Sequence, residues 1–456
     1  MKKAAWLGFG GLLVLHLIIL FNLQFTAWPE MFSFPYLLNN GFRLYTDFVH
    51  VYPPLLTGVL AGFYRIFGYR LWVLQGVAWF LILVADWLIF KTIWLLTKNH
   101  KVAFIGLVFY ILTQPFLEGN TLWFDTAIVV PVLAGTYWLF KKQYFWSGLC
   151  LTLAALTKQT AGLFIISGLG FVVFREKNLK KVMAFLVAPL LAGLGLTSYL
   201  LTTNSLADFV NWTLVYPSQY WTQFPGYVQL SLSKRELFTL LILGSPFLLA
   251  LFKFKKRILD ENNLMFVICN LLLTIVIVYP RWSFFHFQTA LALLAILIGT
   301  ASSVKLRNPG LLWMGYFFFL LVFVSLPMAR RSWREEPRFW SSTELATAQT
   351  VKQKLNGSNS LFLLGPNSVY YVLTTTLPSK PWLDNFGWYW EIPGVAEKAL
   401  ASWNLNPPDY VLAEKPQTGD WFDLGTYRPT MVTNWLVENY NQKELITENL
   451  TLWQRN

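Results

Sequence analysis

The chain has 456 residues, of which 55% are hydrophobic, 18% aromatic and only 13% charged. Soluble domains carry about 25% charged residues, so this composition excludes an ordinary water-soluble protein. The formal net charge of +13 gives no reason to expect nucleic acid as a partner, because basic clusters between apolar segments are the usual anchors to anionic membrane lipid. We therefore expect an α-helical polytopic membrane protein, since a backbone in lipid must satisfy its own hydrogen bonds.

Apolar segments follow one another along most of the chain, and a helix needs roughly 20 such residues to cross the hydrocarbon core. The first, "AAWLGFGGLLVLHLIILF", follows two lysines and is longer than the roughly 7–15 residues of a signal-peptide core, so it is predicted to be a membrane helix. The eleven predicted spans are 4–25, 71–96, 102–117, 124–140, 144–157, 160–174, 182–203, 237–252, 264–280, 287–304 and 311–328.

The basic clusters all fall on one side of these spans, and the positive-inside rule makes that side cytoplasmic. They are Lys2 and Lys3, 98–101, Lys141 and Lys142, 175–181, 253–257, and Lys305 with Arg307. Joining the short spans 144–157 and 160–174 into one helix would reverse the order of everything downstream, so they are kept as a pair. The acidic residues then expected on the outer side are Glu30, Asp47, Glu118, Asp125, Asp208 and Glu236. We expect a multi-pass protein of the plasma (inner) membrane with its polar chemistry outside.

Hydrophobicity stops after Met328, which predicts two domains: a membrane domain, 1–328, and a soluble extracytoplasmic domain, 329–456. In the second, a helix followed by a short strand is predicted three times. The pairs are "STELATAQTVKQKL" with "NSLFLLGP", "GVAEKALASW" with "PPDYVLAEKP", and "TNWLVENY" with "ELITENLTLW". This order is typical of a small α/β domain.

A long connection, 26–70, separates the first two spans. It has about 45 residues, far more than a compact connection needs, and it is too apolar and aromatic to be disordered. Its stretch "NNGFRLYTDFVHVYPPL" (39–55) contains Arg43, Asp47 and His50. The segment that follows, 53–68, has the pattern of an amphipathic helix lying at the membrane interface.

The double proline in this loop restricts the backbone. Pro53 and Pro54 limit their own φ angles and the conformation of Tyr52 before them. Together with Tyr45, these residues are expected to position the loop, so that Asp47 is held in one place.

At this point the residues resemble a known family. Gly41, Tyr45 and Asp47, followed by Pro53, Pro54 and Leu55, are similar to the first outer loop of integral-membrane glycosyltransferases of the GT-C superfold. The branch in question contains protein O-mannosyltransferases and the lipid A aminoarabinose transferase, and the resemblance extends to the order of spans and the outer C-terminal domain. Phe48 stands where the protein-mannosyltransferase pattern has an acidic residue, so a peptide acceptor is not implied.

The resemblance implies a donor made of a sugar linked to polyprenyl phosphate in the membrane lipid, and Asp47 as the base that accepts a proton from the acceptor. Transfer to a hydroxyl needs such a carboxylate, and it needs cationic groups or a metal for the departing phosphate. We therefore predict a hexosyl or pentosyl transferase that acts by inverting displacement on an extracytoplasmic glycan, lipid or protein.

Asp125, in "EGNTLWFDTA", is the second catalytic candidate, to orient the acceptor or to hold a divalent metal ion with Asp47; alternatively, it caps the helix that begins at Thr126. No cofactor follows from the sequence alone. Lys158, Arg281 and His286 are the candidates for binding the donor phosphate, because ionisable side chains at membrane depth are often functional. Lysine and arginine near helix ends also extend to the interface without such a role.

Weaker candidates for contact with the acceptor or its sugar are Arg43 and His50 in the loop, and Trp388 and Tyr389 in "GWYWEIPG". The two aromatic residues are alternatively explained by docking of the soluble domain, and the tryptophan- and tyrosine-rich loop 211–231 by the aromatic belt of membrane proteins. Asp86 is interpreted as a structural residue paired inside the bundle.

Two other functions are considered. A lipid or glycan transporter or flippase would show repeated halves or paired broken helices, and neither is visible. A glycan polymerase usually has a large loop in mid-chain and no soluble tail. The sequence lacks a GxxxxGK motif, which agrees with a lipid-linked donor rather than a nucleotide.

Overall fold

The computed structural model describes residues 3–259, 262–303, 309–384, 386–415 and 429–456. The chain forms two compact units. One, here called the helical unit, comprises Met1–Thr26, Leu74–Gly195 and Leu230–Glu335. The other, called the sheet unit, comprises Ala27–Val73, Leu196–Gln229 and Glu336–Asn456.

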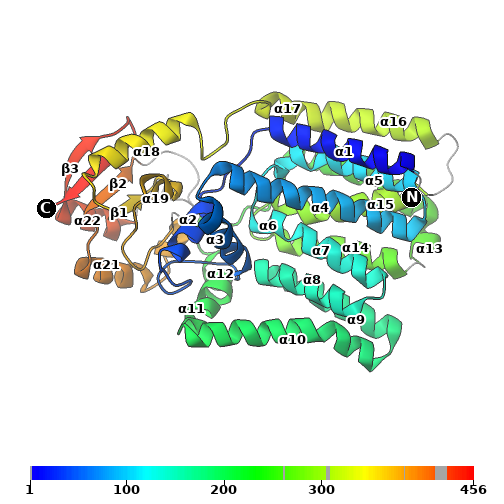
Figure 1. The fold of residues 1–456 in the computed structure, drawn as a ribbon, viewed down its shortest axis with the longest axis horizontal. Coiled ribbons are helices and arrows are strands. Elements are labelled where there is room, and N and C mark those ends of the chain that lie inside the picture. Colours follow the sequence, from blue (N-terminus) through cyan, green and yellow to red (C-terminus); the bar gives the residue numbers. More distant parts are fainter. Residues whose placement is uncertain (1–2, 260–261, 304–308, 385, 416–428) are drawn as a thin grey trace. The chain divides into compact units, whose positions relative to one another are not determined.

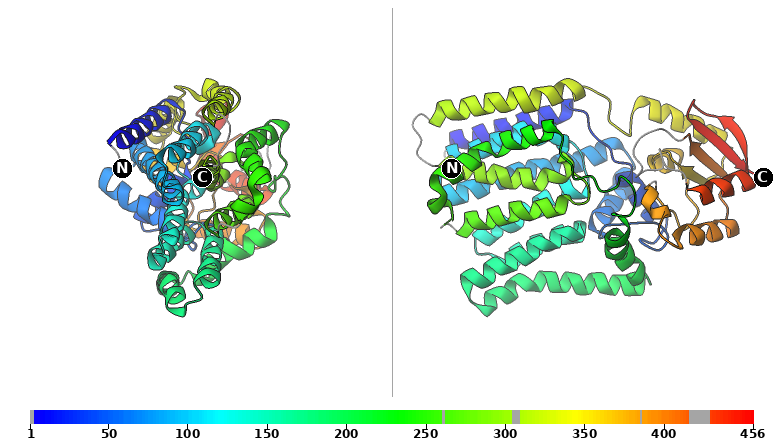
Figure 2. Two further views of the ribbon diagram at one scale, coloured as in Figure 1. Left: turned by 90° about the vertical axis from the view of Figure 1, so that its right-hand side faces the viewer. Right: turned by 180° about the vertical axis from the view of Figure 1, so that it is seen from behind.

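The helices of the helical unit run side by side (Figures 1 and 2). Its long helices are α1 (Lys3–Asn22), α4 (Leu71–Thr97), α5 (His100–Thr113), α7 (Val129–Phe140), α8 (Tyr144–Thr157), α9 (Gly162–Glu176), α10 (Leu179–Thr202), α13 (Lys234–Leu259), α14 (Asn262–Val278), α15 (Gln288–Ala301) and α16 (Pro309–Leu320). The last residues of α10 and the first of α4 are grouped with the sheet unit. Shorter turns are η1 (Pro115–Gly119), α6 (Phe124–Ala127), η2 (Gln159–Ala161), η4 (Phe284–Phe287), η5 (Leu321–Ser325) and α17 (Leu326–Ser332).

Each of the eleven predicted spans overlaps one of these long helices. Among the described residues, five helical segments are long and apolar enough to cross a membrane by themselves, and shorter apolar helices lie between them. A multi-pass membrane protein is therefore confirmed, while the count of eleven spans stays a prediction.

The core of the helical unit is built around α15, which is buried on every side from Gln288 to Thr300. A helix that is apolar all round is typical of a bundle interior. It lies against α5, and a Cβ atom at Gly106 would come within 2.6 Å of the Ala295 carbonyl oxygen. Small residues let helix backbones approach closely in membranes, so Gly106 is required for this contact.

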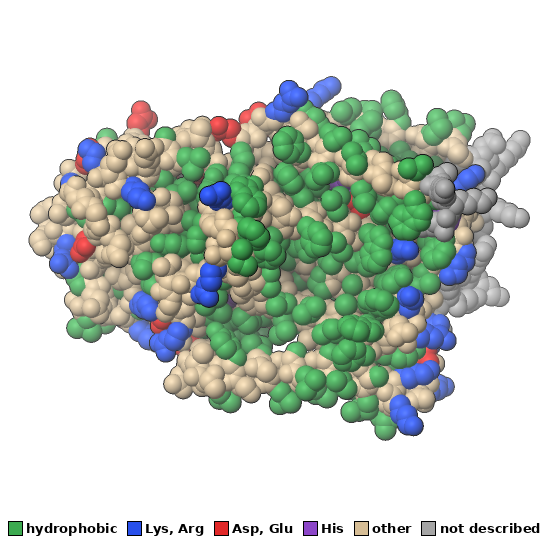
Figure 3. Space-filling model, viewed as in Figure 1, with side chains coloured by type: hydrophobic (Ala, Val, Ile, Leu, Met, Phe, Trp, Pro, Cys, Tyr) green, Lys and Arg blue, Asp and Glu red, His purple; other side chains and the backbone are tan. Residues whose placement is uncertain are grey.

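The outward faces of the bundle are apolar, as lipid requires. Leu7, Phe21 and Phe174 are each more than two-thirds exposed, and hydrophobic side chains cover the bundle in Figure 3. On that face, lysine and arginine gather at the end of the bundle where α4 ends and α9 meets α10. This distribution agrees with the basic clusters that were used to predict the orientation.

The sheet unit contains a four-stranded mixed sheet in the order β1-β2-β4-β3. Its strands are β1 (Leu361–Leu364), β2 (Tyr410–Glu414), β3 (Tyr440–Leu445) and β4 (Leu450–Arg455). β1 and β2 pair in parallel, with Leu361 opposite Tyr410, and the other pairs are antiparallel. The helices are α2 (Glu30–Asn39), α3 (Leu55–Phe67), α11 (Leu206–Val210), η3 (Asn211–Val215), α12 (Tyr216–Tyr220), α18 (Ser342–Lys354), α19 (Val369–Thr374), α20 (Gly387–Trp390), α21 (Val395–Leu405) and α22 (Thr430–Asn439).

The α/β character of 329–456 is confirmed, with one correction. The segment "ELITENLTLW" was predicted as a single strand, but it contains the turn of the β3–β4 hairpin. The hydroxyl of Thr447 accepts hydrogen bonds from the backbone N–H groups of Asn449 and Leu450. Threonine and asparagine favour such local bonds over a continuing ladder, which explains the reversal.

The two units do not follow the predicted domain boundary, because the sheet unit combines 336–456 with 27–73 and 196–229. Within it, α3 occupies the place of the amphipathic helix predicted at 53–68. Where the lipid boundary runs, at 328 or elsewhere, stays a prediction.

Candidate functional site

The loop that carries Asp47 is held by backbone pairing. The Asp47 N–H donates to the Arg43 carbonyl oxygen at 3.0 Å, which closes a turn. The Trp382 N–H donates to the Asp47 carbonyl oxygen at 2.9 Å, and the Val49 N–H donates to the Trp382 carbonyl oxygen at 3.1 Å. Asp47 is therefore fixed on both sides by a segment of the C-terminal region, as a short strand would be.

The Asp47 carboxylate lies between two cations. It accepts from the Arg43 backbone N–H at 3.0 Å and from Arg43 Nη2 at 3.0 Å. Lys380 Nζ donates to Oδ2 at 2.8 Å, the same oxygen that accepts from the Arg43 backbone N–H, while Arg43 Nη2 binds Oδ1. The Asp47 side chain is 9% exposed, whereas those of Arg43 and Lys380 are 52% and 47% exposed. The carboxylate is thus shielded, while its cationic partners are open to solvent.

Electrostatics keep this carboxylate ionised. Burial by itself raises the pKa of Asp47, but the hydrogen bonds from Arg43 and Lys380 outweigh it and lower the pKa below its ordinary value. The ionised carboxylate is the form that a general base needs, and its proton affinity rises when one of the cations is shared with another anion.

Lys380 was missed by the sequence analysis. It stands in "LPSKPW", which has no periodicity or motif that marks it, and it meets Asp47 across 333 positions of the chain. Arg43, predicted as a weak acceptor contact, is bound to Asp47 instead of being free in the loop. A second acidic residue, Asp208 on α11, accepts a hydrogen bond from Thr46 Oγ1 at 3.0 Å.

The predicted positioning residues make contacts that suit that role. The Tyr45 hydroxyl donates to the Tyr52 carbonyl oxygen at 2.9 Å, and Pro53 and Pro54 lead directly into α3, with Pro54 at its N-cap position. Tyr45 has φ of 71°, a left-handed conformation that is uncommon outside glycine. The tight turn before Asp47 therefore stores strain, as functional loops often do.

His50 is buried completely within this loop. Its Nδ1 lies 2.6 Å from the Tyr52 carbonyl oxygen and its Nε2 lies 2.8 Å from Thr57 Oγ1. Burial lowers the pKa of His50 to about 4, so the ring is neutral near pH 7. Contact of His50 with an acceptor, which the sequence analysis considered, would require this packing to open.

A second polar cluster lies in the helical unit. The Asp125 carboxylate, on α6, is 2.5 Å from Lys158 Nζ and 3.0 Å from His286 Nδ1. Lys158 follows the last residue of α8, and His286 lies on η4. All three side chains are mostly buried, with Asp125 at 1% exposure. The structure thus brings together one catalytic candidate and two phosphate candidates.

The local geometry excludes helix capping as the role of Asp125. The turn begins at Phe124 rather than at Thr126, and no side-chain cap by Asp125 is formed; the Thr126 hydroxyl accepts from the Trp123 N–H instead. Helix capping therefore does not explain the residue. Arg281 lies in the connection between α14 and η4 and is partly buried, and its phosphate-binding role stays a prediction.

A divalent metal does not suit either carboxylate as it stands. Arg43 and Lys380 already bind Asp47, and Lys158 and His286 already bind Asp125. Within the described residues, no group of three or more His, Cys, Asp or Glu side chains is arranged to hold a metal ion. A metal would have to displace these cations, so we assign no step to one.

Trp388 and Tyr389 lie on α20 and are almost completely buried, at 1% and 3% exposure. Tyr389 packs edge-to-face on Trp212 with ring centroids 5.5 Å apart, and Trp388 contacts Trp221 at 6.1 Å. The aromatic loop 211–231 thus covers α20. Docking therefore accounts for both residues, and contact with an acceptor sugar would require that loop to move.

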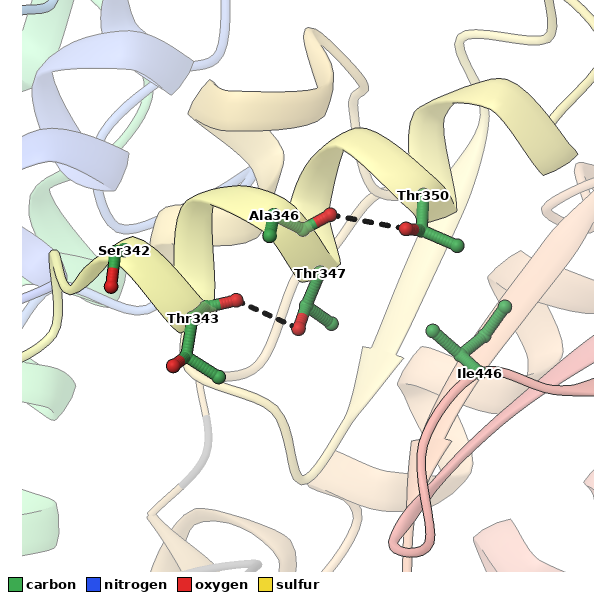
Figure 4. Close-up of a pocket in the computed structure, with 6 residues that line it drawn as sticks. All are labelled: Ser342, Thr343, Ala346, Thr347, Thr350 and Ile446. Atoms are coloured by element: carbon green, nitrogen blue, oxygen red, sulfur yellow. Dashed lines mark hydrogen bonds between the residues drawn. The ribbon is translucent and has the colours of Figure 1, made fainter.

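A shallow hollow of about 500 Å³ lies between α18 and the turn after β3 (Figure 4). It is lined by Ser342, Thr343, Ala346, Thr347, Thr350 and Ile446. The hydroxyl groups of Thr347 and Thr350 donate to backbone carbonyl oxygens of their own helix. The lining contains no titratable side chain, so this hollow offers no acid, base or nucleophile.

Comparison with known proteins identifies the class of fold. Residues 51–200 match the family described as dolichyl-phosphate-mannose-protein mannosyltransferase. No curated protein matches the chain in a sequence comparison.

Solved structures that are similar at low identity include three from different organisms. ArnT from Cupriavidus metallidurans, bound to undecaprenyl phosphate, has a TM-score of 0.62 at 10% identity, over 99% of this chain and 98% of that one. The oligosaccharyltransferase AglB from Archaeoglobus fulgidus, in complex with an inhibitory peptide and a dolichol-phosphate, has a TM-score of 0.53 at 11% identity, over 89% and 69%. The arabinofuranosyltransferase AftD from Mycobacteria has a TM-score of 0.53 at 11% identity, over 98% of this chain and 40% of that one.

The fold is the one seen in these solved structures, and the family match over residues 51–200 agrees with the resemblance of the sequence to integral-membrane glycosyltransferases. The fold and the family match favour a transferase over a transporter. The family match begins four residues after Asp47, so the role of Asp47 depends on the loop motif and on its geometry.

Proposed function

We propose that this protein transfers a sugar from a polyprenyl-phosphate donor to an acceptor on the extracytoplasmic side of the plasma (inner) membrane. The matched family uses dolichyl-phosphate-mannose in its name, and two of the similar structures are complexes with undecaprenyl phosphate and with a dolichol-phosphate. The observation that carries the proposal is the Asp47 carboxylate, fixed in the loop between Arg43 and Lys380.

In the proposed reaction, an acceptor hydroxyl gives its proton to Asp47 as its oxygen bonds to the anomeric carbon. The bond from that carbon to the phosphate oxygen breaks, and polyprenyl phosphate leaves with the electron pair. Attack opposite the leaving group is a single displacement, so the product has inverted anomeric configuration.

The half-exposed cations give this mechanism a way to activate its base. Arg43 and Lys380 lower the pKa of Asp47 in the resting protein. When an anion binds beside them, they share their positive charge with it, and the proton affinity of Asp47 then rises.

The second cluster is proposed to bind the donor phosphate through Lys158 and His286, with Asp125 holding both side chains in place. A buried ammonium needs an anion or water near it. Asp125 provides one, and a phosphate oxygen can provide another, because an ammonium donates three hydrogen bonds. Arg281 is proposed as a further phosphate ligand.

The test is transfer by the purified protein in lipid nanodiscs, with a panel of polyprenyl-phosphate sugars and, in parallel, nucleotide sugars. We expect product from at least one lipid-linked donor and none from nucleotide sugars. Product from nucleotide sugars, or movement of the lipid across a bilayer without any transfer, would overturn the proposal.

A further inference from the structure

A buried polar pair lies deep within the helical unit. His16 Nδ1, on α1, is 2.7 Å from Asp86 Oδ2, on α4, and both side chains have no solvent exposure. The expectation that Asp86 is paired inside the bundle agrees with this contact. Ionisable groups at membrane depth are costly and are retained where they have a function, so this pair is a candidate for a role beyond packing.

The His16–Asp86 pair is connected by a hydrogen bond to Gln114, the residue that follows the last residue of α5. His16 Nε2 lies 3.3 Å from Gln114 Oε1, and Gln114 Nε2 donates to the Gly119 carbonyl oxygen at 2.8 Å. The second bond orients the amide, so its oxygen faces the imidazole and Nε2 of His16 must carry a proton. His16 Nδ1 faces the Asp86 carboxyl group, so the two ring nitrogens of His16 link Asp86 to Gln114.

The bond to Gly119 reaches a turn that only glycine can form. A Cβ atom at Gly119 would lie 2.2 Å from the Gln114 carbonyl oxygen and 2.7 Å from Gln288 Oε1. Next to it, Glu118 has φ of 56°, which is left-handed. Gln288 on α15 also donates to the Leu117 carbonyl oxygen at 2.7 Å. The 115–119 turn is therefore built tightly around the amides of Gln114 and Gln288.

This turn holds the segment that carries His286. The Glu118 carboxylate accepts hydrogen bonds from the Ser283 hydroxyl and from the Phe285 N–H, the latter at 3.2 Å. Gln288 adds a bond to the Phe284 carbonyl oxygen at 3.0 Å. His286, one residue after Phe285, contacts Asp125. An unbroken series of hydrogen bonds and short backbone links thus joins the buried pair to the Asp125 cluster.

We propose that Asp86, His16 and Gln114 are positioning residues that set the 115–119 turn and, through Glu118, the place of His286 beside Asp125. The inference rests on the proposed function for its activity assay but not for its structural readout. A displacement of about 1 Å far from the reacting atoms can lower the rate by about a hundredfold, so a device of this kind has a measurable effect.

Three variants test the proposal. Gln114→Leu removes both amide bonds at similar volume, and we expect a loss of about 10- to 100-fold in kcat/KM. Asp86→Leu removes the partner of His16 Nδ1 and should lower activity similarly, while Asp86→Glu, which keeps a carboxyl group, should recover part of it. The matched control is Asn270→Ala: Asn270 is equally buried in the same unit, and its amide donates to Phe266 within α14. It should leave kcat/KM within about threefold.

A double-mutant cycle separates positioning from general destabilisation. If Gln114 acts through His286, Gln114→Leu should have little further effect in a His286→Ala background, since coupled sites are not additive. Effects that simply multiply would overturn the proposal. Absence of transfer by the wild-type protein would refute the proposed function instead.

Hydrogen exchange gives a readout that does not need activity. Gln114→Leu should speed amide exchange in 283–287 at least tenfold relative to wild type, whereas Asn270→Ala should not. If both variants leave this segment protected, or expose it equally, the relay through Glu118 is wrong.

Discussion

Replacement of Asp47 by asparagine is the sharpest test of the site. The variant keeps the size of the side chain and an oxygen that can accept from the Arg43 backbone N–H, which lies 3.0 Å from the carboxylate. It loses the negative charge and the ability to take a proton. The loop itself is held by backbone bonds to Trp382, which the substitution does not touch.

The expected cost to folding is small. Arg43 and Lys380 are about half exposed, so water can solvate them once Asp47 is neutral, and such pairs contribute about 0–1 kcal/mol. The expected cost to catalysis is large, because a positioned general base contributes about 10²–10⁴ in rate, or about 3–5 kcal/mol of activation free energy. The small loss of stability and the large loss of transfer rate can therefore be measured separately in this one variant.

The assay measures transfer from a polyprenyl-phosphate sugar alongside the thermal midpoint of unfolding and the anomeric configuration of the product. Asp409→Asn is the matched control, since it makes the same chemical change in the same unit at a carboxylate that accepts from the Ser358 hydroxyl, and it should transfer within about threefold of wild type. Transfer by Asp47→Asn at a near wild-type rate, or retention of the donor's configuration, would refute the single-displacement mechanism.

Lys158→Met removes one charge of the buried Lys158–Asp125 ion pair. It should lower the thermal midpoint of unfolding, since breaking a buried ion pair costs about 3–5 kcal/mol. Asp125→Asn added to Lys158→Met should restore much of that stability. If Lys158 binds the donor phosphate, the KM for the donor is raised in both the single and the double variant. An unchanged KM would mean that Lys158 has a structural role only. Burial and the nearby charge of Asp384 raise the pKa of Glu30 to about 8, so its contribution to stability is full below pH about 4.3 and is lost as the pH rises to 8. Glu30→Gln should therefore raise the unfolding midpoint at pH 8.5 but not at pH 4, and equal shifts at both would contradict the linkage. For orientation, with both native cysteines replaced, a cysteine at Thr350 should be labelled in intact cells and one at Lys177 only after permeabilisation; the reverse would overturn the topology.

Properties that depend on a short window of sequence were predictable. The length of an apolar run decides whether a helix can cross lipid, and all eleven predicted spans overlap helices. The helix–strand order of the C-terminal region and the amphipathic helix α3 follow from periodicity in the same way. The β3–β4 turn was missed because "ELITENLTLW" is apolar enough to be one strand. The hydrogen bonds of the Thr447 hydroxyl favour a turn, but they become decisive only once the partner strand is in place.

The amino-acid sequence by itself determined that the chain is a membrane protein, that the loop around Asp47 resembles a known family, and which residues are candidates for the functional site. Only the tertiary structure decided which charges meet: Lys380 binds Asp47 from 333 positions away, and Lys158 and His286 converge on Asp125. It also showed that Trp388 and His50 are buried. The physical reason is that contacts between distant segments depend on how whole helices and strands pack, whereas hydrophobic length, periodicity and proline restriction act within a few residues.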